Sequence, residues 1–315
     1  MALWTPTLIT TAHWLDASDS STVTLNGSTV SQWADKSGSG KHATQGTAAS
    51  QPTRLAADQN GLDVLSFDGI ANRMDHSFVA STAEISIFLV VAANSQSGYR
   101  GIYSTSGDNT SNTMLLARTD TANWGTYGTT AQSANSSIQS AGFLQLALIR
   151  IAAGSGIFWR NGASDGSFIA SSGQPGHVGG TSSIPQHFGG KIAEIVVLSG
   201  TVSTESRQLL EGYLAWKWGL VGNLAADHPY KSAAPTTANK VSGTVTVNGS
   251  PAARTVAVFL RSNFTLLGTT TSDASTGAFE IIGVPSDANA LLVTAIDSTD
   301  TYNAVSVDYI TSVSS

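Results

Sequence analysis

Two polar stretches of this chain carry aromatic residues that could recognise sugars. The first reads R-T-D-T-A-N-W-G-T-Y-G-T-T-A-Q-S-A-N and places Trp124 and Tyr127 among small polar residues without the periodicity of a buried element. The second, S-G-Y-R-G-I-Y-S, contains Tyr99 and Tyr103. Aromatic faces can stack on pyranose rings while amides and hydroxyls bind the sugar hydroxyl groups. We therefore predict ligand contacts at these four residues, with inward packing as loop anchors as the alternative.

Carboxylates arranged to cut glycosidic bonds are sparse in this sequence. Such chemistry uses two carboxylates, which share one face of a strand only at even spacing. The chain has five glutamates, and none has another carboxylate two residues away. Glu194 lies in an apolar, strand-like run, where a hydrogen-bonded structural role is the better interpretation. The numbers of serine, histidine and aspartate residues would allow a Ser-His-Asp triad, but the sequence predicts no enzymatic activity.

Composition limits the classes of partner. Charged residues make up 11% of the chain, against roughly 25% in an average soluble protein, and the net charge is −6. Without a basic stripe, nucleic acid is not an expected partner. There is no cysteine, which excludes disulfides and thiolate chemistry. The N-terminus lacks the pattern of a signal peptide and no run of eighteen apolar residues occurs, so neither export by a visible signal nor membrane insertion is expected.

The pattern of short β-branched runs and turn residues predicts an all-β sandwich. One amphipathic helix is expected near residue 210, with Ser203 as its N-cap and Gly219 as its end. The polar stretches 94–112 and 118–140 are interpreted as loops or irregular hairpins. A change of pattern near Pro235 predicts two domains, 1–235 and 236–315. The strands are expected at 22–25, 64–67, 85–92, 114–117, 144–151, 156–160 and 192–198.

Several motifs resemble laminin-G-like (concanavalin A-like) jelly rolls of phage and bacterial type. They are W-L-D-A-S-D from Trp14, V-S-Q-W-A-D-K-S-G-S-G-K-H-A-T-Q from Val30, N-G-L-D-V-L-S-F-D-G from Asn60, and the strand and helix between Gly189 and Lys231. The resemblance covers about residues 10–231 and implies a jelly roll with one short helix near its C-terminal end. It also implies core positions for four tryptophans, namely Trp14, Trp33, Trp216 and Trp218.

The same resemblance implies a calcium site, because laminin-G-like domains sometimes hold calcium through loop aspartates. Asp16 and Asp19 are the candidate ligands. Asp35 and Asp68 are better explained as residues that cap turns, since aspartate binds its own local backbone in such positions. No calcium loop of the D-x-[DN]-x-[DN]-G type occurs, and the six histidines show no zinc-like spacing.

The C-terminal region resembles a different small module. The sequence K-V-S-G-T-V-T-V-N-G-S-P-A-A-R alternates apolar and polar residues around Asn248 and Gly249, and T-T-T-S-D-A-S-T-G-A-F follows. Over about residues 240–310 this pattern resembles the carboxypeptidase-regulatory-like (transthyretin-like) β-sandwich with an immunoglobulin-like arrangement of strands. The last residues also resemble small domains appended to phage virion proteins.

Together the resemblances imply a non-enzymatic bacteriophage virion structural protein, either tail-associated or capsid-decorating. Its lectin-like module would attach to carbohydrate on the host surface. A purely architectural decoration or cement protein and a polysaccharide depolymerase are the alternatives. The expected partners are other virion proteins and host glycans, with many copies or a homo-oligomer on the particle. The expected location is the virion, after synthesis in the host cytoplasm, and calcium is the only cofactor considered.

Overall fold

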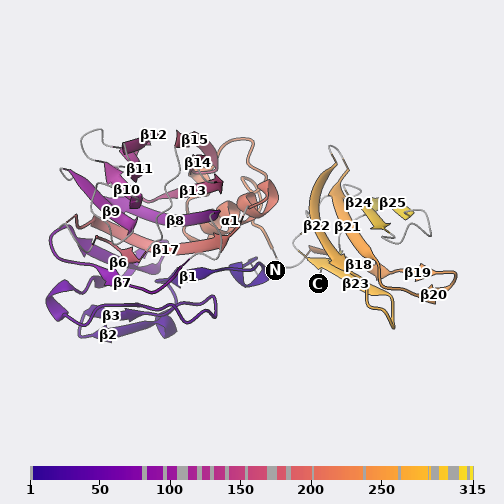
Figure 1. The fold of residues 1–315 in the computed structure, drawn as a ribbon, viewed down its shortest axis with the longest axis horizontal. Coiled ribbons are helices and arrows are strands. Elements are labelled where there is room, and N and C mark those ends of the chain that lie inside the picture. The colour runs from indigo at the N-terminus through magenta and orange to yellow at the C-terminus, as the bar shows by residue number, and fades with distance from the viewer. Residues whose placement is uncertain are drawn as a thin grey trace. The chain divides into compact units, whose positions relative to one another are not determined.

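The chain divides into two compact units in a computed structural model (Figure 1). The larger unit is Pro6–Lys231, and the smaller unit combines Ser232–Ser315 with Met1–Thr5. The division therefore lies slightly before the predicted boundary at Pro235. No helix among the described residues is long and apolar enough to cross a membrane. The structure describes residues 3–79, 84–94, 98–104, 113–118, 123–127, 131–138, 142–152, 155–168, 176–181, 186–200, 202–236, 239–261, 264–282, 284, 291–296, 305–310 and 313–314.

Antiparallel strands and one α-helix make up the described part of the larger unit, so the predicted all-β class with a single short helix is confirmed. The helix α1 is Thr204–Lys217. The strands are β1 (His13–Asp16), β2 (Val23–Asn26), β3 (Thr29–Trp33), β4 (Ala43–Thr44), β5 (Thr53–Gln59), β6 (Leu62–Asp68), β7 (Met74–Asp75), β8 (Ile85–Ala93), β9 (Tyr99–Ser104), β10 (Thr113–Arg118), β11 (Asn123–Tyr127), β12 (Ala131–Ser137), β13 (Leu144–Ala152), β14 (Ser155–Arg160), β15 (Ala163–Phe168), β16 (His177–Val178) and β17 (Gly189–Ser199).

Strand β17 is the centre of one layer (Figure 1). It pairs with β8 along one edge, and with β6 and then β1 along the other. The layer continues from β8 through β13 and β14 to β15. A second run of pairs joins β12, β11, β10, β9 and β16. The hairpin β14–β15 is therefore an end of the first layer.

The main core of the larger unit is filled from alternate positions of the strands. In β8, Ile87, Leu89 and Val91 belong to this core. Phe88 points to the other face because successive residues of a strand alternate. There it lines a narrow crevice together with Leu214 of α1. Both faces of β8 are thus buried, which explains its continuous apolar sequence.

Local signals set the ends of helix α1. Ser203 is the N-cap, and its side chain accepts a hydrogen bond from the backbone N–H of Ser206 at 3.1 Å. Glu205 in the first turn and Lys217 in the last complement the helix dipole. Gly219 follows with φ +69°, a left-handed conformation that suits glycine after a helix. The helix prediction is confirmed.

Two stretches interpreted as loops or irregular hairpins are paired strands with irregular register, so the hairpin alternative holds. The stretches 94–112 and 118–140 contain β9, β11 and β12, and β10 lies between them. Their polar composition suggested loops, but backbone pairing in a sheet does not require apolar side chains on both faces. Irregular registers within the β10 and β11 pairings break the simple alternation, so the sequence carries little period-two signal.

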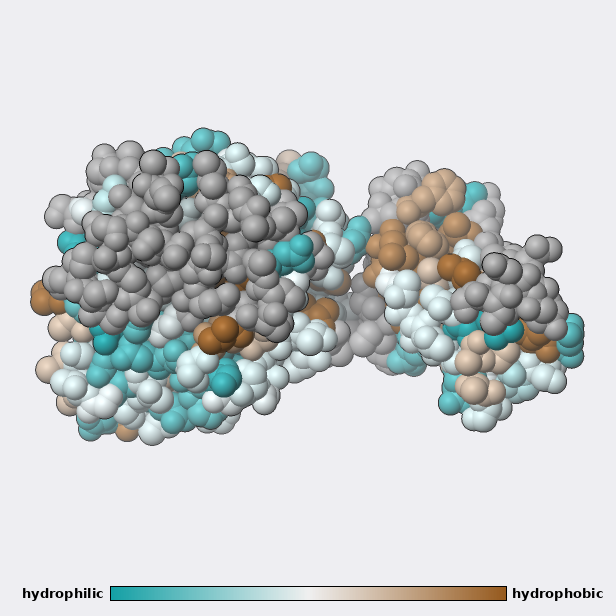
Figure 2. Space-filling view, in the orientation of Figure 1, coloured by the Kyte–Doolittle hydropathy of each residue, from teal (hydrophilic) through white to brown (hydrophobic). Residues whose placement is uncertain are grey.

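The smaller unit contains two main sheets, in the orders β23-β18-β26 and β22-β21-β24-β25, and the ribbon β19–β20. Val241 and Ile281 from the first sheet share a core with Val256 and Val293 from the second. Figure 2 shows apolar side chains gathered on the visible face of this unit. The strands are β18 (Asn239–Thr244), β19 (Thr246–Val247), β20 (Ser250–Pro251), β21 (Thr255–Leu260), β22 (Thr265–Thr271), β23 (Ala278–Ile282), β24 (Leu291–Ile296), β25 (Val305–Ile310) and β26 (Val313–Ser314).

Candidate functional site

A tight turn between β14 and β15 forms the edge of an open hollow in the larger unit. Asn161 and Gly162 both have positive φ, +49° and +80°, as a two-residue hairpin turn requires. The backbone N–H of Gln145 donates to Asn161 Oδ1 at 3.0 Å, and the N–H of Ala225 donates to Asn161 O at 3.2 Å. A Cβ at Gly162 would lie 2.7 Å from the His228 ring. The turn is therefore fixed from both sides.

The hollow has a volume of about 240 Å³ and a polar lining, and we call it the hairpin hollow. Pockets that enclose drug-sized ligands measure roughly 300–1,000 Å³, so this hollow suits a group the size of one ring. Its lining residues come from β12, β14, β15 and the segment around the 3₁₀ turn Val221–Asn223. They are Ser136, Arg160, Asn161, Ala163, Ser164, Asp165, Asn223 and Ala225.

Asp165 is the buried anchor of the hairpin hollow. It is 5% exposed, and each carboxylate oxygen accepts one hydrogen bond from the protein. The hydroxyl of Ser136 donates to Oδ1 at 2.6 Å, and the indole N–H of Trp124 donates to Oδ2 at 3.0 Å. A carboxylate has about four lone-pair positions, so these two bonds leave acceptor capacity for a ligand.

Arg160 has no counterion among the described residues, because no ion pair or side-chain hydrogen bond joins it to them. Its Nε is buried and has no hydrogen-bond partner there either. Arg160 and Phe158 share one face of β14 since they are two residues apart. The side chain therefore lies on the inner face, at the end of the core, where it lines the hollow.

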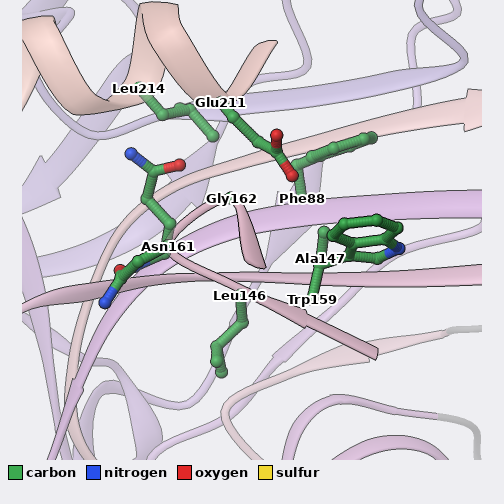
Figure 3. Close-up of a pocket in the computed structure, with 9 residues that line it drawn as sticks. Phe88, Leu146, Ala147, Trp159, Asn161, Gly162, Glu211 and Leu214 are labelled. Atoms are coloured by element: carbon green, nitrogen blue, oxygen red, sulfur yellow. The ribbon is translucent and has the colours of Figure 1, made fainter. Parts of the chain in front are cut away.

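A second, narrower feature lies between α1 and the sheet, and we call it the helix crevice. Figure 3 shows Glu211 and Leu214 extending from α1 toward Phe88 and Trp159. The helix crevice has essentially no volume open to water. Gln145 lines it and is 3% exposed, yet neither polar atom of its side chain has a hydrogen-bond partner in the described structure. The helix crevice and the hairpin hollow share Asn161.

Charged residues close the helix crevice. The Arg207 guanidinium donates to both carboxylate oxygens of Glu211, at 2.8 and 2.7 Å, and its Cζ stacks 3.6 Å from the ring centroid of Trp159. His228 Nε2 lies 3.2 Å from Glu211 Oε2. Both members of the Arg207–Glu211 pair belong to α1 and are nearly buried, and the stacking of Arg207 on Trp159 links the helix to β14.

Ser164, His228 and Glu211 do not form a catalytic triad in this structure. The stretch G-A-S-D-G around Ser164 has the sequence pattern of a nucleophile elbow. An elbow joins a strand to a helix, however, whereas Ser164 lies within β15, the second strand of a hairpin. His228 Nδ1 accepts a hydrogen bond from the backbone N–H of Tyr230, and its Nε2 faces Glu211. Neither nitrogen is left to act as base toward a serine.

The structure does not place the four predicted aromatic residues together on an exposed loop. Trp124 is fully buried in β11, and its ring packs 4.6 Å from that of Phe158, centroid to centroid. Tyr103 is also fully buried, and Tyr99 is half-buried. The side chain of Tyr127 lies outside the described residues. Trp124 and Tyr103 pack inward, as the alternative expects, and neither ring is exposed to a ligand in this structure. Trp124 still supports the hairpin hollow from beneath through Asp165.

Tyr103 is part of a buried cluster with His13 and His76. Its hydroxyl donates to His13 Nδ1 at 2.7 Å, and His13 Nε2 donates to the carbonyl of Lys41 at 2.8 Å. The His76 ring stacks on Tyr103 with 5.1 Å between centroids. Burial lowers the pKa of His13 to about 4 and the pKa of His76 to about 2. Both imidazoles are therefore neutral near pH 7.

The predicted calcium ligands are already paired with lysines. Asp16 lies 2.8 Å from Lys217 Nζ and 2.9 Å from Lys36 Nζ, and Asp19 lies 2.7 Å from Lys36 Nζ. Ammonium groups thus occupy the space beside both carboxylates. No group of three or more histidines and carboxylates in the described structure could hold a metal ion. These residues do not fit a calcium site.

Glu194 has the structural role predicted for it. It is fully buried, and four donors contact its carboxylate: Trp14 Nε1 at 2.8 Å, the Tyr213 hydroxyl at 2.9 Å, Lys217 Nζ at 2.7 Å and Trp218 Nε1 at 2.7 Å. We call these five residues the Glu194 cluster. Burial raises the pKa of Glu194, and the nearby Lys217 opposes that rise. The cluster joins β1, β17 and the C-terminal end of α1.

The structure also tests the predicted turn-capping aspartates and the predicted core tryptophans. Asp35 accepts bonds from the backbone N–H groups of Trp14, Ser37 and Lys41, and Asp68 accepts from three successive N–H groups, so both cap turns as predicted. The core positions are confirmed for Trp14, Trp33 and Trp218. Trp216 is only half-buried and donates its indole N–H to Tyr230 O.

The residues of the hairpin hollow were not found from the sequence. Ser136 and Asn223 are far from the hairpin along the chain, so spacing alone could not join them. One signal was present: Arg160 and Asp165 flank an Asn-Gly turn on the strand face that continues from the apolar Phe158. A charged residue on the inner face of a hairpin is unusual and indicates an edge of the core or a site.

No protein-family model matches the chain, and no curated protein sequence is similar to it. Solved structures show distant similarity. Trypanosoma rangeli sialidase in complex with sialic acid is 13% identical with a TM-score of 0.47, over 69% of this chain and 34% of that one. Domain 4 of AbnA, a GH43 extracellular arabinanase from Geobacillus stearothermophilus, is 14% identical with a TM-score of 0.42, over 62% and 95%. A mutant of GH54 α-L-arabinofuranosidase is 11% identical with a TM-score of 0.46, over 90% and 72%.

These comparisons correct the predicted function. The structures that the chain is similar to are glycoside hydrolases by name, so the predictions of a bacteriophage virion structural protein and of a protein without enzymatic activity are contradicted. The chain spans about a third of the length of the sialidase chains. A role for particular residues has to come from their own geometry.

Proposed function

We propose that the larger unit binds carbohydrate at the hairpin hollow and that the chain acts in carbohydrate processing. The observation that carries the proposal is the lining of the hollow, which offers side-chain amides at Asn161 and Asn223 and a hydroxyl at Ser164. Sugar hydroxyls both donate and accept hydrogen bonds, and such groups meet both needs. The buried carboxylate of Asp165 adds an acceptor fixed in place by Trp124 and Ser136.

The composition of the chain supports a ligand that is bound mainly through hydrogen bonds. Charged residues are only 11% of the chain. Figure 2 shows that the described surface of the larger unit in this view is mostly polar or near-neutral in hydropathy. A single hollow of this size binds weakly, and several copies on one surface would raise the avidity by roughly 100-fold or more where the geometry allows.

Asp165 is the only carboxylate among the described residues that line the hairpin hollow. Glycoside hydrolysis commonly uses two carboxylates flanking the scissile bond. The described lining therefore supplies groups that bind a sugar.

We also propose the finer family assignment of each unit. The larger unit would be a laminin-G-like jelly roll, supported by the paired strands around β17 and the single helix after it. The smaller unit would be a carboxypeptidase-regulatory-like sandwich, supported by its two-sheet core and by the turn in which Asp273 accepts from the N–H groups of Ser275 and Thr276.

The test is binding of the intact chain to an array of neutral and acidic oligosaccharides, with release of reducing ends measured on the same ligands. Ala163→Trp should fill the hollow and abolish binding without unfolding the protein, because Ala163 is exposed. Ala56→Trp is the matched control, since Ala56 is an exposed strand alanine that does not line the hollow. Equal binding by both variants would show that the hollow is not the site.

A further inference from the structure

We infer that the carbohydrate held in the hairpin hollow carries a carboxylate, and that Arg160 binds it. The inference rests on the proposed function and names the ligand class within it. The ligands concerned are uronic acids and other carboxylated sugars at the position that enters the hollow.

The first step is the charge of Arg160. A guanidinium stays protonated at any pH that the folded protein tolerates. Among the described residues no carboxylate lies within ion-pair distance of it, whereas Arg54, Arg73 and Arg207 in the same unit each have an aspartate or glutamate partner. A half-buried cation without a counterion is costly unless a ligand or solvent supplies the opposite charge.

The second step is that Asp165, the only acid among the described residues that line the hollow, is already bonded to protein donors. Both oxygens of Asp165 face protein donors, the Trp124 indole and the Ser136 hydroxyl. Asp165 is thus held beneath the hollow and does not pair with Arg160. Its remaining lone pairs can accept a sugar hydroxyl, while Arg160 stays available for an anion.

The third step is geometry. Arg160 and Ala163 are paired residues on the two strands of the hairpin, and the Asn161–Gly162 turn between them is fixed by backbone hydrogen bonds. The base of the arginine is therefore rigid. The planar guanidinium matches a carboxylate through two parallel N–H···O bonds, which a neutral hydroxymethyl group cannot reproduce. The carboxylate would bind at Arg160 and the ring hydroxyls at Asn161, Ser164 and Asn223.

The experiment compares two ligands that differ only in charge. Oligogalacturonides and the same oligosaccharides after reduction of their carboxylates to hydroxymethyl groups are titrated calorimetrically into the intact chain. We expect the acidic ligand to bind at least about 10-fold more tightly, the order of a single charge-assisted pair. Arg160→Gln should remove that preference and leave the two affinities within about 2-fold of each other. Added salt should weaken only the acidic ligand's binding.

Arg54→Gln is the control, because it removes the same charge from the larger unit at a residue that does not line the hollow. Its preference for the acidic ligand should equal that of the wild-type protein. Equal binding of the two ligands to wild type would overturn this inference and leave the proposed function intact. Binding of the neutral ligand alone would likewise overturn this inference and leave the proposed function intact. Failure of every acidic and neutral oligosaccharide to bind would contradict the proposed function and, with it, this inference.

Discussion

The Glu194 cluster and the hairpin hollow are both polar, but they differ in how many of their buried polar atoms have hydrogen-bond partners. In the cluster, one buried carboxylate receives four hydrogen bonds, two of them from indole N–H groups. At the hollow and the adjoining helix crevice, Arg160 Nε, Trp159 Nε1 and both side-chain atoms of Gln145 are buried without partners in the described structure. Satisfied polar groups stabilise a fold, and unsatisfied ones reduce its stability. The cluster therefore stabilises the fold, while the unpartnered Nε of Arg160 supports the binding role that we propose for the hollow.

The largest effect is expected from Glu194→Gln. The amide would place an N–H donor against Lys217 or the indoles and would leave a buried lysine without its full counterion. Breaking a buried ion pair from one side costs about 3–5 kcal/mol. Urea denaturation followed by tryptophan fluorescence measures this loss. Asp58→Asn is the control, because Asp58 pairs with a partly exposed Lys191 and surface pairs contribute about 1 kcal/mol or less. A loss of the same size in both variants would refute the special role of the cluster.

The second prediction is that the free energy of unfolding falls at acidic pH, because His13 and His76 are buried and neutral in the folded protein. The folded pKa of His13 is about 4 and that of His76 about 2, both below the unfolded value of 6.5, owing to burial. A histidine whose pKa is lowered by folding does not reduce stability above pH 6.5. Stability is lost as the pH falls from 6.5 toward the folded pKa, because the unfolded chain then binds a proton that the folded protein does not. The slope should be roughly 1.4 kcal/mol per pH unit for each group. Thermal unfolding between pH 7 and 4 measures it.

His76→Phe should keep the stacking on Tyr103 and remove one of the two titrating groups. We expect the slope between pH 6 and 4 to fall by about half relative to wild type. An unchanged slope would mean that His76 does not contribute to the acid sensitivity.

Asp165→Ala tests a residue that should contribute both to binding and to stability. It is a ligand group in the hollow and also the acceptor for the buried Trp124 indole. Leaving that donor unpaired should cost about 1–3 kcal/mol of stability, and oligosaccharide binding should fall at least about 10-fold. Calorimetry and urea denaturation on one preparation measure both. Loss of stability with unchanged affinity would separate Asp165 from the binding site.

Gln145→Leu should have the opposite sign to Glu194→Gln. Leucine has a similar size and removes two buried polar atoms that have no partners in the described structure. Stability should stay unchanged or rise by up to about 1 kcal/mol. A clear decrease in the midpoint of urea denaturation would show that the glutamine has partners in solution and would weaken the contrast between the two regions.

The smallest effect is expected from calcium. Lys36 and Lys217 already neutralise Asp16 and Asp19. Millimolar calcium and an excess of chelator should therefore give the same melting temperature. A calcium-dependent rise in that temperature would restore the metal site that the sequence suggested.

The fold could be predicted where its signals were local. The apolar run of β8 and the Ser203 cap each depend on neighbouring residues, and each was recognised. Trp124 shows why the site could not be predicted. Its polar neighbours hide the fact that its ring packs on Phe158, a contact between segments more than thirty residues apart that no local pattern carries. Arg160, Ser136 and Asn223 meet only after three distant segments have folded together.

The most direct test of the binding role is to map ligand contacts by nuclear magnetic resonance on the intact 32.4 kDa chain. The indole N–H signals of Trp124 and Trp159 report on the hairpin hollow and the helix crevice, and that of Trp218 reports on the Glu194 cluster. Titration with an oligosaccharide that binds should shift the Trp124 signal and the side-chain amides of Asn161 and Asn223, while Trp218 stays fixed. Saturable binding that leaves Trp124 and both amides unchanged would contradict the account and place the carbohydrate elsewhere.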